Sequence, residues 1–224
     1  ARGSAALIYG YSPTVIPKPP DWGNNQQIAG YWFLDTTEGY QPETALLDFL
    51  ADGPPPVYVG FGSMVDHEQE PISQIVIEAL SETGQRGILL GGWSGLGSGY
   101  LPDSIFRVDA IPHDWLFPRM AAVVHHGGAG TTAAGLRAGV PSVVVPSFGD
   151  QFFWGWWVQR LGAGPKPIPR NKLTAAKLVG AIQQAVSDEV VRSKAAQLGQ
   201  QIRAEDGVGT ATRLIEAFVR EGHF

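Results

Sequence analysis

Residues 125–132 read HHGGAGTT and place histidine, glycine and threonine between the apolar run AAVV and the stretch AAGLRAG. Glycine lets a backbone turn sharply and approach a ligand closely. A helix after such a turn points free N–H groups and the positive end of its dipole at the gap, which suits a phosphate. A histidine and the hydroxyls of Thr131 and Thr132 add donors. The stretch therefore predicts an anion site; the alternative is a glycine-rich turn with a threonine N-cap and two structural histidines.

The two adjacent histidines are expected to play different roles. Successive strand residues point to opposite sides, so His125 and His126 do not both face one ligand. His126 lies nearer the turn and is the predicted ligand contact. His125 is expected to be packed or hydrogen-bonded within the protein.

A second glycine loop, VYVGFGSM, ends another predicted strand. It does not fit the dinucleotide-binding pattern, because the third glycine position is Val65 and no acidic residue follows at the expected spacing. The loop is either an ordinary tight turn or a second contact to the same phosphates through Ser63.

A third strand end, PSFGDQ, carries Asp150 and Gln151. A carboxylate accepts hydrogen bonds from vicinal hydroxyls, and an amide both donates and accepts, so the pair suits a sugar. The same residues also suit a turn followed by a helix cap. The next stretch, FFWGWW, holds five aromatic residues, which one helix face cannot bury together. Some of these rings are therefore expected to meet another domain, an acceptor or a membrane.

Alternating strand and helix signals are expected to position these residues. Apolar strands that alternate with amphipathic helices predict an α/β domain with a doubly wound, Rossmann-like parallel sheet, whose ligands bind beyond the carboxyl ends of the strands. The predicted strands cover 56–62, 86–92, 106–110, 121–126 and 141–146. The predicted helices cover 71–84, 113–120, about 131 to 138, 152–162, 173–188 and 208–222.

Composition excludes several other classes of protein. The 224 residues carry a net charge of −5, so nucleic acid is not an expected partner, and 44% hydrophobic residues support a full core. Cysteine is absent, and neither HExxH nor GxSxG occurs, so thiolate metal sites and two common hydrolase sites are excluded. No signal peptide or membrane-spanning run is visible. We expect a cytoplasmic protein that contacts membranes peripherally at most.

Taken together, the strand ends resemble those of UDP-dependent glycosyltransferases, in particular the sterol 3β-glucosyltransferase branch and its bacterial relatives. The matching stretches are PVYVGFGSM, IPHDWLFPRM, AAVVHHGGAGTTAAGLRAGVPSVVVPSFGDQFFWG and LGAGPKPI. Upstream, YGYSPTVIPKPPDWGNN and GYWF are similar to the segment that joins the two halves of that family. The resemblance covers nearly the whole chain.

This resemblance implies a GT-B architecture, in which two Rossmann-like domains enclose the active site and the later domain binds the nucleotide sugar. We therefore expect an interdomain linker and lead-in segment over 1–40, a nucleotide-sugar-binding domain over 41–205, and a C-terminal helix over 206–224. That helix is expected to pack toward an N-terminal domain, with more sequence preceding Ala1. The Pro-, Gly- and Asn-rich start reads as a connecting segment rather than a packed element.

The resemblance also implies roles for individual residues. Diphosphate contacts are expected from Ser63, His126, Gly128, Ala129, Gly130 and Thr131. Nucleoside contacts are expected from Trp93 and Ile111, and sugar contacts from Asp150 and Gln151. Such enzymes invert the anomeric centre, need no metal or other cofactor, and take their general base from the N-terminal domain. No catalytic residue is therefore expected in this chain, which should bind a UDP-sugar without transferring it alone.

Several positions depart from the family pattern. Ala110 stands where plant members carry the tryptophan that stacks on uracil, and Trp93 is expected to supply a ring instead. Ala134 stands where plant members hold ribose with a glutamate, and Trp156 and Trp157 replace residues that we expect to be more polar.

Three hypotheses follow. The first is the donor-binding half of an inverting glycosyltransferase that uses a UDP-sugar, UDP-glucose above all, and acts on a sterol or another lipophilic alcohol. The others are a non-catalytic nucleotide-sugar-binding module and a sugar-nucleotide epimerase of the same architecture.

Overall fold

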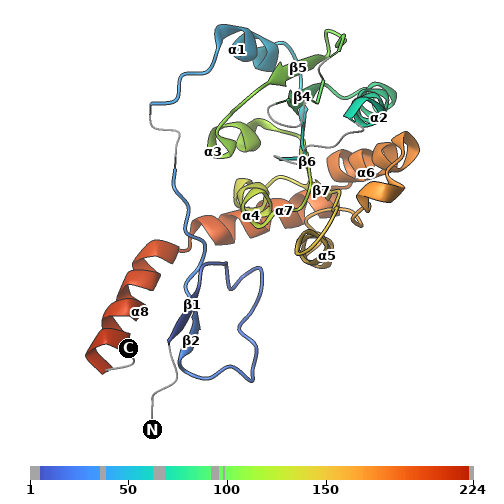
Figure 1. Ribbon diagram of the computed structural model, residues 1–224. Coiled ribbons are helices and arrows are strands. Elements are labelled where there is room, and N and C mark those ends of the chain that lie inside the picture. Colours follow the sequence, from blue (N-terminus) through green and yellow to red (C-terminus); the bar gives the residue numbers. More distant parts are fainter. Residues whose placement is uncertain (1–5, 36–38, 63–68, 92–95, 98, 222–224) are drawn as a thin grey trace.

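A computed structural model describes residues 6–35, 39–62, 69–91, 96–97 and 99–221. At its centre lies a five-stranded parallel sheet in the order β5-β4-β3-β6-β7 (Figure 1). The strands are β3 (Val57–Gly60), β4 (Gly87–Leu90), β5 (Ile105–Val108), β6 (Ala122–His125) and β7 (Ser142–Val144). From β3 the chain adds strands first on one side of the sheet (β4, β5) and then on the other (β6, β7). In open α/β sheets ligands bind at this switch point, here between β3 and β6. The doubly wound α/β fold expected from the sequence is confirmed.

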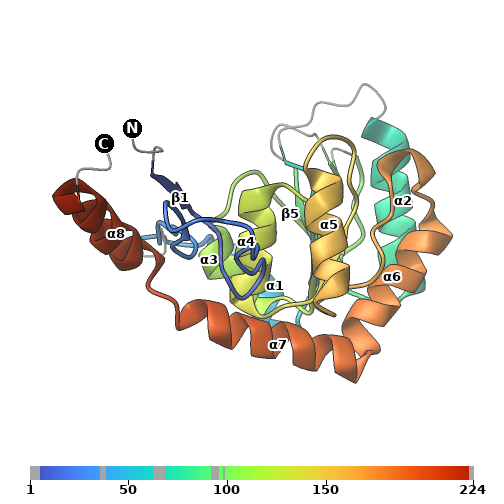
Figure 2. The ribbon, with the colours of Figure 1, turned by 90° about the horizontal axis from the view of Figure 1, so that it is seen from below.

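Helices connect the strands and cover both faces of the sheet. They are α1 (Thr44–Ala51), α2 (Gln69–Glu82), α3 (His113–Leu116), α4 (Ala129–Ala138), α5 (Gln151–Arg160), α6 (Ala175–Ser187), α7 (Glu189–Arg203) and α8 (Gly207–Glu221), with short 3₁₀ turns η2 (Phe117–Arg119) and η3 (Arg170–Lys172). Helices α2 and α6 lie side by side, and α7 runs beneath α4 and α5 (Figure 2).

The alternation of side chains along β3 explains how both faces are filled. Val57 and Val59 pack toward the side of α2 and α6. Tyr58 points the other way and packs with Leu46 of α1 and Trp115 of α3. A further cluster joins Val144 of β7 to α4, α5 and α7. Because both faces are covered, every residue of β3 and β6 is buried, as the apolar strand sequences predict.

The structure corrects two sequence-based expectations about elements. Helix α4 begins at Ala129, with Gly128 as its N-cap, so the predicted start near Thr131 and a threonine cap are wrong. Helix α7 was not predicted at all. Its buried residues Val191, Ala195, Leu198 and Ile202 follow a helical spacing, and the side chain of Asp188 caps its first turn.

The lead-in segment is packed, contrary to the expectation of a plain connecting segment. It contains a parallel pair of strands, β1 (Leu7–Tyr9) and β2 (Gln26–Ile28). Between them, Val15 is fully buried in the cluster beside α4, α5 and α7. Ser12 and Thr14 donate hydrogen bonds to Oε1 of Glu205, at 2.6 and 2.8 Å, which fastens the segment to the end of α7.

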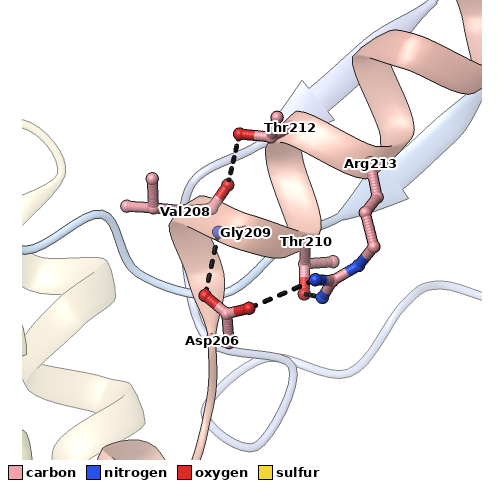
Figure 3. A network of polar contacts seen from close by, with 6 residues as sticks. All are labelled: Asp206, Val208, Gly209, Thr210, Thr212 and Arg213. Atoms are coloured by element: carbon pink, nitrogen blue, oxygen red, sulfur yellow. Dashed lines mark hydrogen bonds and ion pairs between the residues drawn. The ribbon is translucent and has the colours of Figure 1, made fainter.

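Helix α8 carries its own N-terminal cap (Figure 3). The Asp206 carboxylate accepts a hydrogen bond from the backbone N–H of Gly209 at 2.9 Å and pairs with Arg213 at 3.3 Å. Gly207 starts the helix against the lead-in segment, because a Cβ there would lie 2.1 Å from the carbonyl oxygen of Tyr31. The expected helix after residue 205 is therefore present, while its packing toward a further domain stays a prediction.

Within the described part of the chain, no helix combines the length and the apolar character needed to cross a membrane.

Candidate functional site

The turn between β6 and α4 needs glycine at position 127, and its next residue, Gly128, lies against the ring of His126. Gly127 has φ +88°, and a Cβ there would lie 2.7 Å from Cγ1 of Val144. A Cβ at Gly128 would lie 2.4 Å from Nε2 of His126. Gly130 differs, because a Cβ there would meet nothing within 4 Å. The first turn of α4 therefore faces open space, as an incoming anion requires.

His125 has the structural role that the strand alternation predicts. It is fully buried, and its Nδ1 accepts a hydrogen bond from the backbone N–H of Gly127 at 3.0 Å. Its Nε2 has no hydrogen-bond partner among the described residues. Burial lowers the pKa of His125 to about 3, with smaller contributions from His126 and His113. His125 is therefore a neutral side chain that holds the turn.

His126 is half-buried and lies where two strand ends meet. A Cβ at Gly62 would lie 3.0 Å from Cε1 of His126, and the ring approaches Gly128 on its other side. Its Nδ1 is buried and has no partner in the described part of the chain. Burial lowers the pKa of His126, against an opposing effect of Asp150. The neutral ring can therefore donate one N–H beside the start of α4.

The N-terminus of α4 offers backbone donors, but the two threonines differ. Gly128 provides no side-chain cap, and the first N–H groups of a helix have no partner within it. Thr132 is fully buried, and its hydroxyl donates to the carbonyl oxygen of Gly128 at 2.9 Å. The expectation that Thr132 offers its hydroxyl proton to a ligand is therefore wrong. Ala129 and Gly130 are exposed and Thr131 is partly exposed, so these predicted contacts remain accessible.

Asp150 and Gln151 lie at the start of α5, next to the β6–α4 turn. A Cβ at Gly127 would be 2.9 Å from the backbone oxygen of Gln151, which shows how closely the two turns pack. Oε1 of Gln151 accepts hydrogen bonds from the N–H groups of Ser147 at 2.8 Å and Phe148 at 3.3 Å. Asp150 is exposed and accepts a hydrogen bond from Nε1 of Trp154 at 3.1 Å. For Gln151 these contacts support the alternative that the sequence left open, a turn followed by a helix, in which the side chain holds its own turn.

The predicted nucleoside contacts are only partly placed. Ile111 directly precedes the N-cap of α3 and packs against the cluster that contains Tyr58. Ser63 and Trp93, predicted to contact diphosphate and nucleoside, lie outside the described residues.

A cavity of about 690 Å³ opens between the lead-in segment, α3 and α4. Arg137 pairs with both carboxylate oxygens of Asp35 and lies over the ring of Phe33 at 4.4 Å. The lining residues are Phe33, Leu34, Asp35, His113, Asp114, Pro118, Ala134, Arg137, Ala138 and Arg203. Arg137 and Asp35 are 102 residues apart in the sequence, so no local pattern could reveal the pair.

The described residues contain no group of three or more histidine, aspartate or glutamate side chains that could hold a metal ion.

The sequence of the chain is similar to one known protein family and to several characterised proteins. Residues 90–214 match the family described as "Erythromycin biosynthesis protein CIII-like, C-terminal domain". The chain is 47% identical over 216 residues to sterol 3-beta-glucosyltransferase UGT80A2 of Arabidopsis thaliana, covering 95% of this chain and 34% of that protein. It is 44% identical over 221 residues to a sterol 3-beta-glucosyltransferase of Aspergillus oryzae, covering 93% of this chain and 16% of that one.

Solved structures share the fold at low sequence identity. The kitacinnamycin glycotransferase matches with a TM-score of 0.77 and 23% identity over 95% of this chain and 54% of its own. The calicheamicin glycosyltransferase CalG4 matches with a TM-score of 0.76 and 21% identity over 97% and 54%. The chain thus spans about a third of one curated relative, 16% of the other, and about half of each solved structure.

Proposed function

The chain belongs to the family of erythromycin biosynthesis protein CIII-like C-terminal domains, and from that premise we propose that it binds the UDP-sugar donor of an inverting glycosyltransferase. UDP-glucose is the expected donor, and a sterol or another lipophilic alcohol is the expected acceptor. The names of the plant and fungal relatives support this choice. The observation that carries it is the half-buried His126 beside the open first turn of α4.

The site suits donor activation. As the glycosidic bond breaks, negative charge builds on the departing diphosphate. The N–H groups at the start of α4 and the neutral His126 ring are fixed donors, and they stabilise that charge more in the transition state than in the ground state. No metal or other cofactor is needed for this step. The general base would come from outside this chain, so the chain should bind donor without transferring sugar.

The remaining parts of the donor can be assigned to neighbouring features. The cavity beside α3 and α4 is of the size that small-ligand sites have, and we assign it to the nucleoside. Ile111 precedes by two residues His113, which lines this cavity. The exposed Asp150 is the stronger candidate for sugar hydroxyls, since Oε1 of Gln151 already accepts two hydrogen bonds. A cytoplasmic location with peripheral membrane contact at most remains part of the proposal.

Calorimetric titration with UDP-glucose, TDP-glucose and UDP tests the assignment. His126→Ala should weaken UDP binding by about 1–3 kcal/mol, because a hydrogen bond to a charged oxygen is removed. His126→Gln should recover part of the affinity by restoring an N–H donor. As a control, Thr212→Ala on α8, where the hydroxyl donates to Val208, should leave affinity unchanged. Unaltered binding by His126→Ala would remove His126 from the site.

A further inference from the structure

Tyr58 of β3 is a buried tyrosine whose hydroxyl meets a histidine. The side chain is 1% exposed and packs on the face of the sheet that α1 and α3 cover. Gly60 lies on the same face of β3, and a Cβ there would lie 2.2 Å from the hydroxyl oxygen of Tyr58. Glycine at position 60 therefore leaves the space that the hydroxyl occupies. Among the described residues, the hydrogen-bond partner of that hydroxyl is Nε2 of His113, at 3.4 Å.

The ring of His113, the first residue of α3, is held on two sides. It stacks on Phe117, with 4.3 Å between the ring centroids and an interplanar angle of 15°. Tyr58 meets the same ring edge-on and also packs against Phe117, at 4.9 Å between centroids. The backbone N–H of Phe117 donates to the carbonyl of His113, which closes the single turn of α3. The imidazole therefore has a defined orientation.

The buried hydroxyl determines which nitrogen of His113 carries the proton. Burial raises the pKa of Tyr58, so its hydroxyl keeps its proton at neutral pH. A buried hydroxyl proton without an acceptor costs free energy, and Nε2 of His113 can accept it only as an unprotonated nitrogen. Burial lowers the pKa of His113, against an opposing effect of Asp114 and with a smaller lowering by His126. At neutral pH the ring is therefore neutral, with its proton on Nδ1.

His113 connects this buried hydroxyl to the cavity beside α3 and α4. It lines the cavity of about 690 Å³ together with Ala134 of α4, the helix that lies beside α3 (Figure 2). Within the described part of the chain, Nδ1 of His113 has no hydrogen-bond partner. Tyr58 does not line the cavity, so it can act on a ligand there only through His113.

We propose that Tyr58 is a positioning residue, which holds His113 as the Nδ1–H tautomer and so gives the cavity a fixed hydrogen-bond donor. Such a donor matches an acceptor oxygen of a nucleoside, either a ribose hydroxyl or a carbonyl of the base. A donor that is already oriented costs less entropy on binding than one that the ligand must orient. The inference rests on the proposed function, because it takes the cavity to be the nucleoside site.

Nitrogen NMR of the histidine rings tests the tautomer without a ligand. At neutral pH the parent should show His113 protonated at Nδ1, and the loss of the signal in His113→Ala identifies it. Tyr58→Phe keeps the ring that packs on Phe117 but removes the hydroxyl, so the Nε2–H tautomer should become populated. The matched control Tyr40→Phe removes another tyrosine hydroxyl beside the same cluster and should leave the signal unchanged. An Nε2–H tautomer in the parent, or no change in Tyr58→Phe, would overturn the proposal.

Calorimetric titration with UDP measures the consequence for binding. Tyr58→Phe should weaken UDP binding about threefold, and His113→Ala about tenfold, while Tyr40→Phe should bind as the parent does. In the His113→Ala background, Tyr58→Phe should have no further effect, because its action passes through the missing imidazole. A merely structural role would weaken binding equally in both backgrounds, so losses that add would contradict the proposal.

A second ligand identifies the acceptor oxygen. If His113→Ala weakens the binding of UDP but not that of 2′-deoxy-UDP, the acceptor is the 2′-hydroxyl of the ribose. Equal losses with both ligands indicate another oxygen of the nucleoside, and either result supports the donor role of His113.

The same titrations separate this proposal from the proposed function. If the parent binds UDP and His126→Ala weakens that binding, the proposed function stands even where the losses in Tyr58→Phe and His113→Ala add. If the parent does not bind UDP, both proposals fail.

Discussion

The β6–α4 turn and the β7–α5 turn lie against each other but use their polar groups in opposite ways. In the first, the glycines clear space, and the N–H groups at the start of α4 face an opening at Gly130. In the second, Gln151 closes its own turn by accepting two backbone hydrogen bonds, and Asp150 accepts one from Trp154. Polar residues after a strand therefore indicate two different things, an open binding edge or a self-supporting turn.

The largest effect expected from this contrast comes from the glycines of the first turn. Gly127→Ala should lower the free energy of unfolding by about 3 kcal/mol, because a left-handed backbone carrying a Cβ is strained and the new atom collides with Val144. Gly130→Ala should change it by no more than about 1 kcal/mol, since its Cβ would enter open space. Urea unfolding of the two variants measures the difference. Equal losses would mean that the first turn is not open at Gly130.

The second turn can be tested by removing its internal acceptor. Gln151→Leu keeps most of the volume but leaves the N–H groups of Ser147 and Phe148 without their partner, which should destabilise the domain by about 2 kcal/mol. Gln159→Leu, at an exposed position of the same helix, should fall within about 0.5 kcal/mol of the parent. If Gln151→Leu kept full stability and lost only UDP-glucose affinity, Gln151 would bind the sugar rather than close its own turn.

Because His125 of the first turn is buried, the stability of the protein should depend on pH. His125 has a folded pKa of about 3 against an ordinary value of 6.5, so between these values the unfolded state binds the extra proton. The stability that His125 contributes is thus present above pH 6.5 and is lost as pH falls, by about 1.4 kcal/mol per pH unit. His125→Asn keeps an acceptor for the N–H of Gly127 but cannot titrate. Its stability should decline less between pH 7 and pH 5, as measured by denaturation at each pH, and parallel declines would contradict the assignment.

The sequence predicts features that depend on neighbouring residues better than it predicts contacts between distant segments. Strand alternation correctly separates the buried His125 from the half-buried His126, and the apolar runs predict the parallel sheet. What it misses depends on contacts between distant segments. Glu205 receives hydrogen bonds from Ser12 and Thr14, and no local pattern in the lead-in indicates that packing. Whether the Gln151 side chain bonds to its own turn or to a ligand depends on its rotamer and on the shape of the loop. Residue type alone does not determine either.

The smallest expected changes in stability and in UDP affinity distinguish the adjacent threonines Thr131 and Thr132. Thr132→Val removes the hydrogen bond from its buried hydroxyl to the carbonyl of Gly128, so it should lower stability by about 1 kcal/mol and leave UDP affinity unchanged. Thr131→Val removes a partly exposed hydroxyl at the first turn of α4, so it should leave stability unchanged and weaken UDP binding by about 1 kcal/mol, or about fivefold. Unfolding and calorimetric titration of both variants check the pair. The opposite pattern would place the ligand on the Thr132 side of the helix, which the burial of Thr132 does not allow without opening the first turn.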